Sequence, residues 1–185
     1  MNQTKTRYVL ILILIIFIVG LTAYFSTKNN DNHLAISSKN LQKVESWYLL
    51  EMPNLNFQIS FPQEPNFHRT DGKDFTRYTW SYIDDSGNAL FLQAENNLYA
   101  YNPTKRNFVE ESARLYGGVV SSFEENSNLS TATYQISGVY SASTDDTDTI
   151  IGKMIDVNEW TFVLTNQYNK NNQYPEFITS FKRTN

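Results

Sequence analysis

The sequence predicts an α+β protein, in which a largely antiparallel central sheet is flanked by helices and follows one transmembrane helix. Three observations carry this prediction. An apolar run without charge covers Tyr8–Phe25, apolar and polar residues alternate over Leu55–Phe61, and the apolar period lengthens to three and four residues after Pro103. Alternation with a period of two is typical of strands, and intervals of three and four are typical of amphipathic helices. Strands grouped before and between helices indicate an α+β arrangement.

The run Tyr8–Phe25 is the first expected element. As a helix it would span roughly 27 Å at a rise of about 1.5 Å per residue, close to the hydrocarbon thickness of a bilayer. Lys5 and Arg7 precede it, and positive charge on this side predicts a cytoplasmic N-terminus. We therefore expect a cytoplasmic segment over 1–7, a transmembrane signal anchor over 8–25, and a single-pass protein of the inner or plasma membrane. Its C-terminal part would be periplasmic or extracellular.

The alternative for this run is a cleaved secretory signal peptide. Such a peptide has an apolar core of about 7–15 residues and a small-x-small cleavage site. Ala23 could end it, but Leu21 stands where a small residue is required. Whether the segment is cleaved stays open, and both interpretations place the remaining chain outside the cytoplasm.

Composition limits what the rest of the chain can be. We expect a polar linker over 26–40 and one extracytoplasmic α+β domain over 41–185, a size that can bury a core. The chain has no cysteine, which excludes a disulfide scaffold, a thiol nucleophile and a cysteine-based metal site. Lys5 and Arg7 lie before the run, which leaves 13 of the 15 basic residues against all 19 acidic ones. A nucleic-acid binder needs a basic surface instead, so no nucleic-acid partner is expected.

The domain is expected to begin with strands. Trp47 and Leu50 indicate a short strand or extended lead-in within Leu41–Met52. Leu55–Phe61 is a strand with one apolar face, and prolines follow it because proline cannot donate to a sheet. Three further segments complete an antiparallel meander with turns at Asp71-Gly72 and Asp84–Asn88: Phe67–Thr70, Phe75–Ile83 and Ala89–Glu95.

A helix is expected next, with Asn102 as its cap and Pro103 at its first position. Its apolar stripe comprises Phe108, Ser112, Leu115, Val119 and Phe123. Gly117-Gly118 interrupts the stripe, so the helix is expected to end, kink or pack closely there. Three strands and a terminal helix then follow: Thr131–Ser137, Thr149–Val157, Glu159–Gln167 and Pro175–Lys182. Asn158-Glu159 is expected to be a hairpin turn.

Two short motifs in this order resemble a known family. The pattern F-x-I-x-F-P-x-x-P covers Phe57–Pro65, and F-x-x-S-F covers Phe177–Phe181. With the element order, they resemble the PsbP-like superfamily, which includes PsbP, Mog-type and DcrB-like envelope proteins. The resemblance implies an α/β/α sandwich around an antiparallel sheet, and proteins that dock onto assemblies without catalysis. The matching residues are structural positions in that family, and no catalytic residue carries over.

The best candidate for a ligand site is an acidic segment. Asp145, Asp146 and Asp148 lie within four residues and could hold a hard cation through oxygen ligands. The glycine and distal glutamate of an EF-hand are missing, and a solvated turn is the competing interpretation. No catalytic residue and no cofactor are predicted, since the chain has no nucleophile elbow, phosphate loop or dinucleotide fingerprint.

Other polar and aromatic residues are weaker candidates. His33 and His68 are too far apart for a zinc motif. His68 with Arg69 and Asp71 could form a small polar site, but an exposed edge or turn is the favoured interpretation. Tyr99 and Tyr101 could form an aromatic patch for a partner, or simply pack against the core.

Three functions from different classes agree with these features. The first is a membrane-anchored extracytoplasmic binding or assembly module, an accessory protein of an envelope complex, with a protein partner and no nucleic acid. The second is a single-pass subunit of a secretion or conjugation machine with a nuclear-transport-factor-like domain, although that fold places a helix first. The third is an envelope hydrolase, which requires a pocket with convergent acid, base or nucleophile groups.

Overall fold

The described part of the chain forms two antiparallel sheets. The computed structural model describes residues 41–44, 47–100, 103–140 and 147–184, all within one compact unit, Ser37–Asn185. The expected anchor and linker, as well as His33, Tyr101, Asp145 and Asp146, lie outside these residues. No helix among the described residues is long and apolar enough to cross a membrane.

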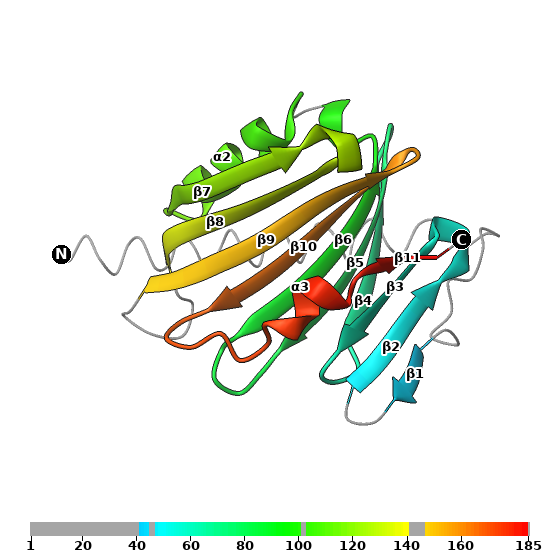
Figure 1. Cartoon of the computed structure of the whole chain (residues 1–185), viewed down its shortest axis with the longest axis horizontal. Coiled ribbons are helices and arrows are strands. Elements are labelled where there is room, and N and C mark those ends of the chain that lie inside the picture. Colours follow the sequence, from blue (N-terminus) through cyan, green and yellow to red (C-terminus); the bar gives the residue numbers. More distant parts are fainter. Residues whose placement is uncertain (1–40, 45–46, 101–102, 141–146, 185) are drawn as a thin grey trace. The chain divides into compact units, whose positions relative to one another are not determined.

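Seven strands form the larger sheet, in the order β4-β5-β6-β10-β9-β8-β7 (Figure 1). Their bounds are β4 Asn66–Asp71, β5 Thr76–Ile83, β6 Ala89–Asn96, β7 Val119–Asn126, β8 Thr131–Tyr140, β9 Thr147–Val157 and β10 Trp160–Tyr168. Six of these strands were expected and are confirmed, whereas β7 was expected to be helical. The hairpin at Asn158 is also confirmed, and the φ of 56° at Asn158 supplies the left-handed turn. The meander β4-β5-β6 is joined to the meander β7-β8-β9-β10 by pairing of β6 with β10.

The smaller sheet has the order β1-β2-β3-β11. Its strands are β1 Leu41–Val44, β2 Trp47–Met52, β3 Phe57–Phe61 and β11 Lys182–Arg183. The chain contains two described α-helices, α2 Lys105–Leu115 and α3 Glu176–Ser180, and three 3-10 turns, η2 Pro53–Leu55, η3 Leu98–Ala100 and η4 Ser127–Leu129. The end of the chain thus pairs with β3, where Lys182 lies opposite Gln58.

The two faces of the larger sheet are covered by different layers. Successive side chains of a strand point to opposite faces, so Phe162 and Val163 of β10 belong to different cores. Val163 lies in a cluster with Val109 and Ala113 of α2. On the other face, the Phe162 ring lies 4.8 Å from that of Phe57 in β3.

The predicted α/β/α sandwich is therefore wrong. One face of the larger sheet carries α2, but the other carries the second sheet together with the five-residue α3. Phe57, Ile59 and Phe61 are fully buried between the sheets. The terminal helix expected over Pro175–Lys182 stops at Ser180, because Phe181 has extended backbone (φ −65°, ψ 124°) and leads into β11. A sheet thus stands where a second helical layer was predicted.

Helix α2 begins later than the expected cap at Asn102 and Pro103, and it ends earlier than its apolar stripe predicts. Thr104 is the N-cap, since its Oγ1 accepts the Asn107 N–H at 3.1 Å; the expected cap, Asn102, lies outside the described residues. At the other end Gly117 has a φ of 73°, and Gly118 N–H donates to the Ala113 carbonyl at 2.9 Å. This is a Schellman cap. Val119 and Phe123 therefore belong to β7 rather than to the helix.

Gly117 is expected to resist substitution more than Gly138. Both have positive φ, so alanine costs about 1 kcal/mol of backbone strain at either position. A Cβ on Gly117 would also lie 2.1 Å from Cε2 of Tyr140, whereas Gly138 has no atom within 4 Å of its Cβ position. We expect Gly117→Ala to lower the free energy of unfolding by a further 1 kcal/mol or so, relative to Gly138→Ala. Urea denaturation of the two variants measures this difference, and equal losses would contradict the contact with Tyr140.

Candidate functional site

A shallow groove of about 480 Å³ lies beside the β9–β10 hairpin. Polar side chains dominate its lining, which comprises Asn96, Asn97, Leu98, Tyr99, Asp156, Asn158, Glu159 and Thr161. Two left-handed asparagines shape it: Asn97 (φ 66°) turns the chain from β6 into η3, and Asn158 (φ 56°) forms the hairpin turn. The Asn97 Nδ2 donates to the Asp74 carbonyl at 3.0 Å, which ties this wall to the β4–β5 connection.

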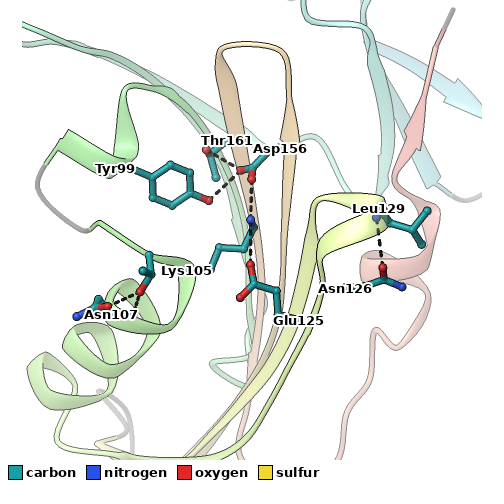
Figure 2. Close-up of polar contacts among 9 residues, drawn as sticks. Tyr99, Lys105, Asn107, Glu125, Asn126, Leu129, Asp156 and Thr161 are labelled. Carbon is teal, nitrogen blue, oxygen red and sulfur yellow. Dashed lines mark hydrogen bonds and ion pairs between the residues drawn. The ribbon is translucent and has the colours of Figure 1, made fainter.

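Asp156, at the end of β9, is the centre of the polar contacts in the groove (Figure 2). Its Oδ1 accepts the Tyr99 hydroxyl at 2.9 Å and the Thr161 hydroxyl at 3.0 Å. Its Oδ2 lies 2.7 Å from Lys105 Nζ. The Asp156 backbone is also bound, since its N–H donates to the Ser130 carbonyl and its carbonyl accepts Arg183 Nη2 at 2.7 Å. The carboxylate is therefore fixed from several elements.

Lys105 is a buried cation at the first residue of α2. A positive charge at a helix N-terminus is unfavourable because the helix dipole is positive there. Two carboxylates compensate it, Asp156 at 2.7 Å and Glu125 of β7 at 3.4 Å. Nζ also lies 5.7 Å from the centre of the Tyr99 ring. The ion pair thus joins α2, β7 and β9 at one point beneath the groove.

The titratable groups of this cluster are held in one protonation state. Burial and the hydrogen bond to Asp156 raise the pKa of the Tyr99 phenol to about 12. Burial alone would lower the pKa of Lys105, but its hydrogen bond to Asp156 and the neighbouring Tyr99 and Glu125 raise the pKa overall. Both pKa values are shifted further above pH 7. Tyr99 therefore stays a neutral hydrogen-bond donor and Lys105 stays a cation near pH 7. These two groups hold protons rather than transfer them, which suits binding better than acid–base catalysis.

The raised pKa of Tyr99 predicts a loss of stability at alkaline pH. In the unfolded chain a tyrosine ionises near pH 10, whereas Tyr99 in the fold ionises near pH 12. Its contribution is fully present below pH 10 and is lost as the pH rises through about 12. The parent protein should therefore lose unfolding free energy between pH 10 and 12. We expect the Tyr99→Phe variant to lose less over the same interval, as measured by urea denaturation.

The same replacement at the exposed Tyr140 controls for the general effect of removing a phenol. If Tyr99→Phe and the parent protein lose stability equally over this interval, the hydrogen-bonded state of Tyr99 is not as described.

Two residues at the rim of the groove, Asn158 and Glu159, have side-chain oxygens that can accept hydrogen bonds from a partner. Asn158 and Glu159 are exposed, and Glu159 forms no ion pair with any residue that the structure describes. The charge of Asp156 is matched by Lys105, so Glu159 contributes the uncompensated negative charge of the rim. Amide and carboxylate oxygens of this kind accept hydrogen bonds and attract cationic groups.

Of the three predicted metal ligands, only Asp148 lies within the described residues. Asp148 is buried in β9, and its Oδ2 accepts Gln167 Nε2 at 2.6 Å. Its Oδ1 has no hydrogen-bond partner among the described residues. Asp145 and Asp146 lie outside the described segments, where the cation site stays an untested prediction. Among the residues that can be described, no three acidic or histidine side chains form a group that could hold a metal.

The remaining candidates lie apart from the groove or have a packing role. His68 is exposed on β4, the edge strand, and Arg69 pairs with Asp71 at 2.9 Å. Tyr99, predicted as a patch residue or a packing residue, is half-buried against Asp156.

Sequence reasoning missed Asp156, Lys105 and Thr161. One signal was available: Asp156 continues the buried face of β9 formed by Ile150 and Met154, where a carboxylate requires a partner.

Neither the protein-family models nor the curated proteins contain a match to this chain.

Proposed function

We propose that this protein is a membrane-anchored, extracytoplasmic binding module that acts as an accessory protein of an envelope complex. The groove around Asp156 is the observation that carries the proposal. It combines a floor held by the Lys105–Asp156 ion pair with an exposed rim of amide and carboxylate oxygens. A partner that presents a lysine or arginine beside backbone or side-chain donors would match this rim.

Membrane attachment rests on the sequence. Tyr8–Phe25 is long and apolar enough for one span, and Lys5 and Arg7 favour a cytoplasmic N-terminus. The domain would then face the periplasm or the exterior.

Crosslinking in intact cells tests the binding role. A photo-crosslinking amino acid replaces Asn158 on the rim of the groove in the full chain, and adducts are identified by mass spectrometry. We expect a discrete protein adduct at this position and none at Asp85, an exposed residue of the β5–β6 turn. Recovery of only background proteins from the Asn158 position would contradict the proposal.

A pair of charge reversals tests the chemistry of the rim. Glu159→Lys removes the negative charge at the groove, and Glu124→Lys makes the same change on β7, where the side chain is also exposed. We expect the adduct yield to fall about tenfold for Glu159→Lys, as for loss of one charged contact, and to stay unchanged for Glu124→Lys. Equal adduct yields from both variants would contradict a partner that binds the rim through a cationic group.

A further inference from the structure

Strand β4 is an open edge of the larger sheet. Within the described part of the chain, β5 is the only strand that pairs with β4. All six residues of β4 are exposed or half-buried. The N–H and C=O groups of an edge strand can form a ladder with another chain, and proteins usually protect such an edge. The outer side of β4 is therefore a candidate interaction surface.

The hairpin between β4 and β5 shows which backbone groups face outward. Gly72 N–H donates to the Phe75 carbonyl at 2.9 Å, so these two residues form a hydrogen-bonded pair. Pairs with and without hydrogen bonds alternate along an antiparallel ladder, so the next pair, Asp71 with Thr76, is not hydrogen-bonded. Thr76 agrees with this, because its N–H donates to Asn96 Oδ1 at 2.6 Å, on the side of β6. The N–H and C=O groups of Asp71 thus point away from β5.

The same alternation applies two positions earlier. Arg69 pairs with Tyr78 of β5, and this pair is also of the kind without hydrogen bonds. The backbone groups of Arg69 and Asp71 therefore lie together on the open side of β4. Both residues can accept a further strand without losing any bond to β5.

The other edges of the two sheets are less suited to pairing. Strand β7 has an irregular register between Val120 and Ser122, and it ends in the like charges of Glu124 and Glu125. Strands β1 and β11 have only four and two residues. The register of β4 with β5 is continuous over six residues, and β4 contains neither proline nor lysine. Bulges, short length, proline and lysine are the usual protections of an edge, and β4 has none of them.

Arg69 and Asp71 give the open edge one charge of each sign. Their side chains lie on the same face of the sheet, because they are two positions apart on a strand. Arg69 Nε lies 2.9 Å from Asp71 Oδ2, and the two side chains are 31% and 52% exposed. The Arg69 guanidinium also lies over the Tyr78 ring, at 5.6 Å from its centre. A guanidinium has five N–H donors and a carboxylate about four acceptor sites, so both groups can bind further partners.

A second copy of β4 matches these charges in one antiparallel register. Residues with outward backbone groups pair with one another, so the two-fold axis passes between two copies of a single residue. At Thr70, this axis places each Arg69 opposite Asp71 of the second copy. An axis at Arg69 or Asp71 would oppose like charges, and an axis at His68 would oppose Arg69 to Phe67. Opposite charges across a ladder are stabilising and like charges are destabilising.

We propose that the protein forms a symmetric dimer by antiparallel pairing of β4 with β4 of a second copy, with Thr70 at the two-fold axis. The seven-stranded sheets of the two copies are then continuous. Each opposed Arg69 and Asp71 exchange two backbone hydrogen bonds, and their side chains add a charge-assisted contact. The same surface is used on both copies, as a two-fold interface requires. This dimer goes beyond the proposed function, because it does not involve the groove around Asp156.

Disulfide crosslinking of the full chain in detergent tests the register. The chain has no cysteine. Thr70→Cys would place two thiols in a pair whose Cα atoms are about 4.5 Å apart, which a disulfide can bridge. His68→Cys is the matched control, since His68 lies on the same face of β4 and is exposed. In the proposed register the two copies of His68 are four positions apart along the strands, about 13 Å.

We expect mild oxidation to link the Thr70→Cys variant into a covalent dimer about tenfold faster than the His68→Cys variant, because the paired strands hold the two thiols together. Equal rates for the two variants would overturn the dimer. Faster linking of His68→Cys would overturn the register, and with it the opposed charges on which the proposal depends.

Two charge reversals distinguish contact between copies from contact within one copy. Arg69→Asp leaves two carboxylates on the edge, and Asp71→Arg leaves two guanidiniums, so neither variant should dimerise alone. A mixture of the two should form heterodimers, because every opposed pair then has opposite charges. The variants carry different affinity tags, and co-purification measures the heterodimer. Glu124→Lys, at an exposed position of β7, controls for the change in net charge and should dimerise like the parent protein.

A mixture that stays separate would overturn the dimer, since pairing within one copy cannot be restored by a second variant. Dimers that both single variants retain would also overturn it, and would assign association to another part of the chain, such as Tyr8–Phe25. Crosslinking at Asn158 reports on the groove alone. Failure of the dimer and failure of the proposed function are therefore distinguishable.

Discussion

Replacing Phe57 by alanine is expected to lower the free energy of unfolding by about 4 kcal/mol, the loss typical of a buried phenylalanine. Phe57 is 0% exposed and joins the two sheets. Its ring lies 4.8 Å from that of Phe162, 5.6 Å from that of Phe181 and 5.9 Å from that of Trp80. Truncation would leave a cavity between layers whose backbones are fixed by sheet pairing, so relaxation can fill little of it.

Urea denaturation of the full chain in detergent, followed by tryptophan fluorescence, measures this loss. Phe67→Ala is the control, because that side chain is 44% exposed although it also contacts Trp80. We expect it to cost about 1 kcal/mol, in proportion to the smaller apolar area that it buries. A similar loss for both variants would show that the packing of the two sheets does not depend on Phe57.

Asp156→Asn is expected to have the second-largest effect, a loss of about 3 kcal/mol, because it removes the nearer of the two carboxylates that pair with the largely buried Lys105 and leaves only the more distant one. Asparagine keeps the volume and can still accept a hydrogen bond from Tyr99 or Thr161. It cannot neutralise Lys105, whose side chain is 10% exposed and whose second carboxylate, on Glu125, lies at 3.4 Å. The loss therefore reports on the buried cation rather than on packing.

A double-mutant cycle isolates that cause. Lys105→Met removes the charge and keeps an apolar stem, so the double variant Asp156→Asn with Lys105→Met should lose less than the sum of the two single losses. Asp85→Asn, at an exposed position, should change stability by less than about 0.5 kcal/mol. Additive losses in the cycle would contradict the coupling between Lys105 and Asp156.

The strands were predictable because their signal is local. In β3, Phe57, Ile59 and Phe61 alternate with polar residues, and this period alone predicts a strand with one buried face. The same period does not say what covers that face. Helices and a second sheet both require an alternating strand beneath them, so the sandwich prediction was wrong about the opposing layer. The spacing of Phe177 and Phe181 suggested a helix, but Phe181 is already extended and faces the space between the sheets.

The site was less predictable because it is assembled from distant segments. Tyr99, Lys105 and Asp156 belong to η3, α2 and β9, and Tyr99 and Asp156 are 57 positions apart. A motif search depends on fixed spacing and cannot find such a cluster. The helix cap shows the same limit at short range, since Asn102 and Thr104 are both acceptable caps and only the backbone geometry selects Thr104.

The pairing of β11 with β3 has a consequence for the order in which the domain can be completed. Arg183 lies opposite Phe57, Ser60 N–H donates to Ser180 Oγ, and Thr184 N–H donates to the Asn56 carbonyl. Strand β3, near the start of the domain, therefore lacks this neighbouring strand until β11, near the C-terminus, has been added. A chain that is synthesised from its N-terminus exposes the unpaired edge of β3 until Lys182–Arg183 have been made. The fold closes only when the final segment arrives, so a stalled chain would present that edge to chaperones and proteases.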